Sequence, residues 1–529
     1  MGRPEKRMLG KRKNNEVSKL ALTVICGLVG IGSLIANESS KPKLVVGIMI
    51  DQLRSDYIDY LQNYFGEKGF KRLLKDGVYL QDVDFKVPGL DKVSGTALIY
   101  TGNYPRYNGI TSSKVYSPAA KDMVFALNDP KSLGNFTSET FSPVNLRLST
   151  ISDEIAIDGK GETLIYSIAP DAQQAIVMAG HAGTSAHWIN ENTGNWASTT
   201  YYIDNPVLLI QKNYNNPIKQ RLDTMVWQGK DFQHTFPQSD RNVYRMYASS
   251  PMINREMTDA AISYIEELNL GKGDKGTDML NIAYTVEPYK YDGGTDFRAE
   301  LEDSYIQLDN QLGRLFDAIE KNVGMDEVLV YVSSTGYFDD SAEDDAKFHT
   351  PTGTFSVKRA LSLLNSFLVA HYGNGSYVDT YSDRHIYLDR KGIEEKNLNL
   401  REVAELSRDF LVKMSGVNDA FTMSDIMSST LPSMEGFRLG TDPKTGGDII
   451  LEFNAGWKVV DDTRFPNETK IARATPVLTP VFFMGLDIVP ERVEETVDAV
   501  AIAPTLAQTL RIRAPNGSSS KPLNLKRKN

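Results

Sequence analysis

Uninterrupted apolar runs recur along the chain, each bounded by polar residues. The first, "KLVVGIMID" from Lys43, ends in an acidic residue. Runs without polar alternation are typical of strands buried on both faces, as in parallel sheets covered by helices. We expect strands at each of the similar runs, which are "ETLIYSIA" at 162–169, "AIVMAG" at 175–180, "DMLNIAYT" at 278–285, "EVLVYVSS" at 327–334 and "PVFFMG" at 480–485.

Helical patterns lie between several of these runs. In 304–322 the apolar residues recur at three- and four-residue spacing, which predicts an amphipathic helix. Strands that alternate with helices indicate an α/β fold with a doubly wound, mostly parallel sheet flanked by helices. Ligands of such sheets bind beyond the carboxyl ends of the strands. We therefore expect the site at Asp51, 285–292, 333–337 and the loop before Thr96.

Two segments differ in residue pattern from the alternating strands and helices. Residues 345–445 combine long helical patterns with short polar stretches, and residues 200–270 are aromatic and polar with turn signals such as "YYIDNP". We predict that both are cap segments inserted into one domain that spans 41–529.

The N-terminus is basic and is followed by an apolar run over residues 20–36. This order predicts a signal peptide or a membrane anchor within residues 1–40, and the cleaved and the uncleaved alternatives both remain open. The positive flank favours transfer of the rest of the chain across the membrane. We therefore expect a periplasmic or cell-envelope location, with residues 20–36 in the inner membrane if the segment is retained.

Composition narrows the possible partners. Hydrophobic residues make up 41% of the 529 residues and charged residues 24%, which is ordinary for a globular protein. The net charge of -10 argues against a nucleic-acid partner. The only cysteine, Cys26, lies in the apolar N-terminal run, so the exported part has no thiolate metal site.

Several quoted segments, in their order along the chain, resemble the alkaline phosphatase superfamily. They are "KLVVGIMIDQLRSDY", "KGFKRLL", "IYTGNYPRYNGI", "AGHAGTSAHWINENTGNWASTTYY" and "DAVAIAPTLAQTLRIRAPNG". The closest branch comprises monoesterases that share features with nucleotide pyrophosphatases/phosphodiesterases. The resemblance covers about Lys43 to Leu523 and implies the alkaline-phosphatase-like fold.

The resemblance also implies two metal ions about 4 Å apart, bound by Asp and His, that activate a hydroxyl nucleophile. Asp51 keeps its ligand position, whereas the nucleophile position falls on Lys92. The other positions are also changed: the metal-ligand positions fall on Pro288, Asp292, Thr335, Gly336 and Leu478, and the phosphate-contacting positions on Ser113, Asp171 and Gln173.

These substitutions predict that the two-metal site is lost. We expect the Lys92 ammonium to take the place of the metals and to pair with Asp51, because a buried charge needs a partner. Retention of one metal at Asp51 is the alternative. Ser94 could replace the nucleophile, but a serine needs a base or a metal, and no histidine falls at an expected site position.

The sequence therefore predicts a catalytically inactive protein of the cell envelope, without a cofactor, that acts by binding a protein partner or as a component of an envelope assembly. The alternative is a metal-dependent phosphate or sulfate ester hydrolase, with zinc or another divalent metal. Its site would be rearranged, or hold a single metal, around Asp51, Asp91, Ser94 and Asp292.

Overall fold

A computed structural model describes residues 41–528 apart from 203–205, 215, 274–275, 290, 292–296, 339–351, 464–468 and 473–476. The predicted signal peptide or anchor in residues 1–40 and the candidate ligand Asp292 thus lie outside the described residues. Within the part of the chain that is described, every helix is too short or too polar to cross a bilayer.

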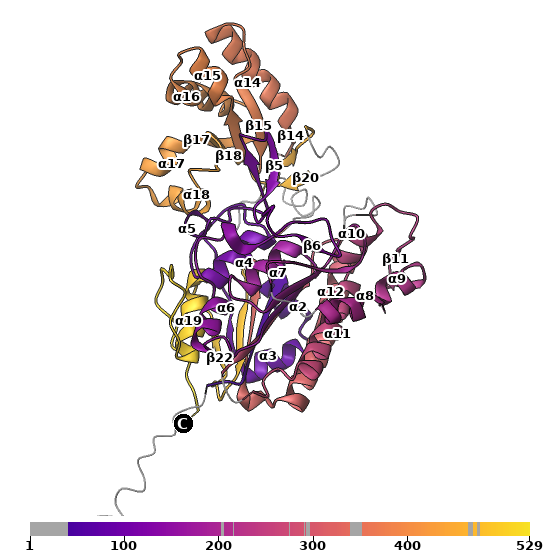
Figure 1. Cartoon of the computed structure of the whole chain (residues 1–529). Coiled ribbons are helices and arrows are strands. Elements are labelled where there is room, and N and C mark those ends of the chain that lie inside the picture. Colours follow the sequence, from indigo (N-terminus) through magenta and orange to yellow (C-terminus); the bar gives the residue numbers. More distant parts are fainter. Residues whose placement is uncertain are drawn as a thin grey trace, which may run out of the picture. The chain divides into compact units, whose positions relative to one another are not determined.

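The described residues form a central ten-stranded sheet (Figure 1). Its order is β22-β2-β21-β13-β1-β12-β7-β8-β9-β6. The five consecutive strands β13, β1, β12, β7 and β8 run parallel to one another. The strands are β1 (Leu44–Asp51), β2 (Gly77–Leu80), β6 (Gly134–Asn135), β7 (Ile165–Ala169), β8 (Ser185–Ile189), β9 (Trp196–Thr199), β12 (Asp278–Thr285), β13 (Val328–Ser334), β21 (Val481–Gly485) and β22 (Glu491–Val493). The predicted mostly parallel sheet is confirmed.

Helices cover both faces of this sheet (Figure 1). Alternate residues of β1 belong to two separate hydrophobic clusters. Val45 and Met49 pack in one cluster, and Val46 and Ile48 pack in the other. The first face carries α4 (Lys92–Thr101), α6 (Ile151–Asp158), α7 (Ala172–Ala179) and α19 (Ile502–Leu510), and the second carries α2 (Ser55–Leu61), α3 (Phe70–Asp76), α11 (Met252–Glu267) and α12 (Arg298–Asn322). Burial on both faces explains why the central strands are apolar without alternation.

One predicted strand is a helix. The run "AIVMAG" forms most of α7, which starts at the N-cap Asp171 and ends at Gly180, whose φ is 71°. Every residue of α7 is buried, so no polar face marks its helical period. A short apolar run of this kind cannot be distinguished from a buried strand by periodicity.

Residues 354–453 contain a second sheet with its own hydrophobic cluster, in orange in Figure 1. Its order is β15-β16-β18-β17. The elements of this segment are β14 (Thr354–Ser356), α14 (Val357–Tyr372), β15 (Val378–Ser382), β16 (His385–Leu388), α15 (Arg390–Glu395), α16 (Leu400–Leu411), β17 (Val417–Thr422), α17 (Met423–Ser428), α18 (Glu435–Gly440) and β18 (Ile449–Phe453).

Shorter elements complete the described chain. Before β12 they are β3 (Val83–Asp84), α5 (Pro105–Asn108), β4 (Lys114–Ser117), β5 (Asp122–Phe125), α8 (Pro206–Tyr214), α9 (Pro217–Arg221), β10 (Val226–Gln228), β11 (Gln233–Thr235) and α10 (Val243–Ala248). After β18 they are β19 (Lys458–Val460), β20 (Thr469–Ile471) and β23 (Val497–Asp498).

Helix α4 approaches the end of β13 more closely than a side chain would allow. A Cβ on Gly95 would lie 1.8 Å from the carbonyl oxygen of Thr335, which is backbone and cannot rotate away. Glycine is therefore required in the first turn of α4, and this contact fixes the position of Lys92 relative to the strand ends.

We expect Gly95→Ala to lower the free energy of unfolding by about 3 kcal/mol or more, because α4 must move off β13. Urea denaturation followed by circular dichroism measures the change. Gly273→Ala is the matched control, because open space surrounds that position, and its effect should stay within about 0.5 kcal/mol. Equal stability of the two variants would contradict the packing argument.

Candidate functional site

Helix α4 starts at Lys92 because Asp91 caps it. The Asp91 Oδ1 accepts hydrogen bonds from the backbone N–H groups of Val93 and Ser94, at 3.1 and 2.9 Å, and the Ser94 Oγ accepts one from the Asp91 N–H. The Asp91 Oδ2 accepts hydrogen bonds from Ser113 N and Ser112 Oγ, at 2.6 and 3.0 Å. Asp91 thus ties the start of α4 to the 112–113 loop.

The fallback nucleophile Ser94 is part of this cap. Its side chain is buried, and its hydroxyl also donates to the Asp91 Oδ1 at 2.9 Å. A hydroxyl engaged in a capping box on the inner side of a helix is not available for attack on a substrate. The structure therefore gives Ser94 a structural role and does not bring it into the crevice.

Asp51 lies at the carboxyl end of β1, as expected, and its side chain is 2% exposed. Its Oδ1 accepts a hydrogen bond of 2.7 Å from the Thr335 hydroxyl, at the end of β13. Its Oδ2 lies 3.4 Å from the Lys92 ammonium nitrogen and has no hydrogen-bond partner among the described residues. The predicted pairing of Lys92 with Asp51 is confirmed.

A second carboxylate, missed in the sequence analysis, completes the ion pair. The Glu287 Oε2 lies 3.5 Å from the Lys92 ammonium nitrogen. Glu287 follows β12 within the predicted crevice segment 285–292. The family pattern drew attention to Pro288 and Asp292 instead, although the position of Glu287 after a buried strand would have sufficed to find it.

The predicted phosphate-contacting positions have structural roles. Asp171 caps α7 by accepting a hydrogen bond of 2.9 Å from Gln174 N–H. The buried Gln173 side chain accepts a hydrogen bond from Leu127 N–H and donates one to Ser113 O, both at 3.0 Å. These contacts hold the loop around residue 113 against α7. Neither Gln173 nor Ser113 offers a positive charge to an anion.

The remaining predicted ligand positions do not form a cage. Pro288 is buried, Gly336 has no side chain and Leu478 is 41% exposed. Among the described residues no three His, Cys, Asp or Glu side chains are grouped as a metal would require. The Lys92 ammonium instead lies between the two carboxylates. The described residues therefore do not fit the two-metal centre that the resemblance implies.

Burial and charge shift the pKa values of this cluster in opposite directions. Burial raises the pKa of Asp51 to about 6, against the attraction of Lys92, which lowers it. Burial also raises the pKa of Asp171. Burial alone would lower the pKa of Lys92, but the nearby Glu287, Asp51 and Asp171 raise it well above its ordinary value. Lys92 is thus a permanent cation, not a nucleophile.

The Lys92 side chain is partly exposed, whereas its main partner is buried. The Lys92 side chain is 31% exposed and that of Asp51 only 2%. This arrangement can offer a positive charge to an oxyanion and, at neutral pH, a carboxylate that can accept a proton.

Comparison with known proteins gives matches over nearly the whole chain. The sequence model described as "Type I phosphodiesterase / nucleotide pyrophosphatase" matches residues 45–474. A protein named calcium-transporting ATPase, from Myroides odoratus, is 26% identical over 541 residues, covering 95% of this chain and 98% of the relative. Alkaline phosphatase PafA of Elizabethkingia meningoseptica is also 26% identical over 541 residues, covering 95% and 97%.

The crystal structure of wild-type alkaline phosphatase PafA has the same fold. It superposes with a TM-score of 0.80 and 24% identity, covering 92% of this chain and 98% of that one. The alkaline-phosphatase-like architecture expected from the sequence is confirmed.

The prediction of a catalytically inactive protein is contradicted by these relatives. The family description and the name of PafA are those of phosphoester hydrolases, and the matches span the whole fold. They favour the alternative, a metal-dependent phosphate or sulfate ester hydrolase with a rearranged or single-metal site. The changed ligand positions do not by themselves establish inactivity, and Lys92 supplies positive charge at the strand ends.

The raised pKa of Asp51 predicts a pH-dependent stability. A carboxyl group with a higher pKa in the folded than in the unfolded state stabilises the fold at low pH, and this contribution is lost as the pH rises through the folded value. Between about pH 4 and pH 7 the wild type should therefore lose about 2 to 3 kcal/mol relative to Asp51→Asn. Urea denaturation of both proteins across this range measures the difference; a constant difference would contradict the shift.

Proposed function

Because the chain belongs to the type I phosphodiesterase / nucleotide pyrophosphatase family, we propose that it is a phosphoric ester hydrolase. In this proposal the phosphoryl group of the substrate binds at the Lys92 crevice, beyond the carboxyl ends of β1, β12 and β13. This is the edge at which open α/β sheets bind their ligands.

The observation that carries the proposal is the partly exposed side chain of Lys92, whose ammonium nitrogen lies 3.4 Å from Asp51 and 3.5 Å from Glu287. Two fixed carboxylates keep it charged and in one place. A preorganised positive charge stabilises the charge that develops on phosphoryl oxygens during ester cleavage, and such groups are usually the largest contributors to catalysis.

Asp51 is the candidate general base. Its pKa of about 6 lies close to neutral pH, and its Oδ2 has no hydrogen-bond partner among the described residues. It would accept a proton from a water molecule as the water oxygen attacks phosphorus and the ester oxygen leaves. Thr335 holds the other carboxylate oxygen and thereby orients the base.

The proposal includes no step through a metal. The described residues do not form a two-zinc centre, and the Lys92 ammonium lies 3.4 Å from Asp51, the one retained ligand position, and 3.5 Å from Glu287. The positive charge is thus part of the chain, and activity should not depend on added zinc.

We also propose the periplasm or cell envelope as the location. The support is the basic and apolar pattern of residues 1–36. A protein partner in the envelope stays a prediction from the sequence, tested by cross-linking and mass spectrometry of the tagged full-length protein in its native membrane fraction.

We expect Lys92→Ala to lower kcat for an aryl phosphate by about 100-fold or more, because loss of one preorganised charge-stabilising group has that effect in other hydrolases. Aryl phosphate monoesters, diesters and aryl sulfates are tested, each with EDTA and with added zinc. Lys68→Ala is the control, because Lys68 is an exposed lysine paired with Asp317.

Activity of the wild type that persists in EDTA and is lost in Lys92→Ala supports the proposal. Circular dichroism and a thermal melt verify that the variant folds, and Lys92→Arg, which keeps the charge, should retain more activity than Lys92→Ala. Absence of wild-type turnover of every ester under both conditions would overturn the proposed function, and activity that requires zinc would overturn the metal-free site.

A further inference from the structure

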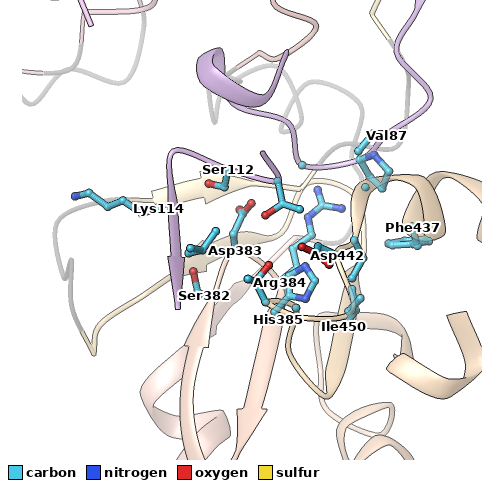
Figure 2. A pocket seen from close by; sticks show the side chains of 18 of the residues that line it. Val87, Ser112, Lys114, Ser382, Asp383, Arg384, His385, Phe437, Asp442 and Ile450 are labelled. Carbon is cyan, nitrogen blue, oxygen red and sulfur yellow. The ribbon is translucent and has the colours of Figure 1, made fainter. Parts of the chain in front are cut away.

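A pocket lies between the segment 382–450 and the loops on either side of α4 and α5 (Figure 2). One wall is the hairpin that joins β15 to β16, and the opposite wall is the 87–89 and 111–115 loops. Ser112, which lines the pocket, is hydrogen-bonded to Asp91, the residue before Lys92. Ser112 thus connects the pocket to the N-cap of α4, and Lys92 does not line the pocket.

The hairpin in this pocket has an unusual sequence for its geometry. Ser382 pairs with His385, so Asp383 and Arg384 alone form the turn, with φ values of 44° and 74°. Two-residue turns with both φ values positive strongly favour Asn-Gly or Asp-Gly, because only glycine adopts the second position without strain. An arginine there costs stability, which suggests that its side chain has a function.

The acidic side chains of the pocket are already neutralised. The Asp383 carboxylate lies 3.0 Å from the Lys470 ammonium nitrogen, and Asp442 is paired with Arg147. By contrast, the Arg384 guanidinium makes no hydrogen bond or ion pair with any described residue. Arg384 thus brings a positive charge to the pocket beside an Asp383 carboxylate that is already paired with Lys470.

His385 adds a neutral hydrogen-bond donor. Burial lowers its pKa to about 4, so the ring is uncharged at neutral pH. Its Nδ1 accepts a hydrogen bond of 3.2 Å from Gly447 N–H, which places the ring proton on Nε2. Figure 2 shows His385 and Arg384 among the pocket side chains and the Lys114 ammonium pointing away. The Lys114 ammonium instead lies 4.9 Å from the centre of the Phe125 ring.

We propose that this pocket binds a phosphate group through the Arg384 guanidinium, with the His385 Nε2–H as a second donor. A guanidinium offers paired N–H donors that match two oxygens of one phosphate, and its charge persists at every relevant pH. The phosphate belongs either to an organic phosphate or to free inorganic phosphate. Binding here requires no catalysis at Lys92, so this proposal stands independently of the proposed function.

Isothermal titration of the full-length protein with inorganic phosphate tests the site. Arg384→Gly should weaken binding by about tenfold or more, as expected for loss of a charged hydrogen-bonding group. The same variant should melt at a higher temperature than the wild type, because glycine relieves the positive φ. A loss of binding therefore cannot be attributed to unfolding.

Lys121→Gly is the matched control. Lys121 is an exposed cation with φ 51° in the β4–β5 turn, so this variant also removes one charge and one positive-φ side chain. It should melt at a higher temperature and bind phosphate like the wild type. Because Lys92 is itself a proposed phosphate-binding group, the Arg384 and Lys121 variants are also compared in a Lys92→Ala background, in which binding at the pocket should persist and depend on Arg384.

Three outcomes would overturn the proposal: no phosphate binding by the wild type, equal binding by Arg384→Gly, or a loss of binding in Lys92→Ala alone. A parallel titration with phenyl phosphate distinguishes the two sources. Tighter binding of phenyl phosphate indicates an organic phosphate, and tighter binding of inorganic phosphate indicates free phosphate. Either result supports phosphate binding in the pocket, provided that the Arg384→Gly variant loses that binding.

Discussion

Carboxylates gather at the carboxyl ends of parallel strands, and the Lys92 ammonium is the group that makes this possible. Asp51 ends β1, Glu287 follows β12 and Asp171 follows β7, so one edge of the sheet brings three acids together. Desolvating an ionised carboxylate costs several kcal/mol unless a cation compensates. With two of these acids within 3.5 Å of one ammonium, the edge tolerates their burial.

The position of that ammonium depends on local features of α4. Asp91 fixes where the helix begins and Gly95 allows its first turn to contact Thr335. Thr335 in turn donates its hydroxyl to the Asp51 carboxylate. A cap, a close backbone contact and a hydrogen bond thus place the cation and its partner relative to each other.

The strands of this sheet could be predicted from sequence because their burial on both faces leaves a continuous apolar run, as in "LVVGIMID". A continuous apolar run led to the wrong prediction of a strand at α7, because this helix is buried on all sides. In the site, Lys92 and Asp51 were found because their positions match a family pattern. Glu287 was missed because no position of that pattern falls on it, and Arg384 because its conformation depends on a strand pairing that a single sequence does not display.

In the proposed mechanism a lysine supplies the positive charge, which changes which residue must handle protons. A metal ion both offers positive charge and lowers the pKa of a water molecule that it binds. An ammonium ion has no coordination position, so it supplies charge alone, and deprotonation of water falls to a carboxylate. Asp51 suits this task because burial raises its pKa while Lys92 lowers it, and the balance is about 6. In this proposal the cation that would stabilise the oxyanion also lowers the pKa of the base and so favours its ionised form near neutral pH.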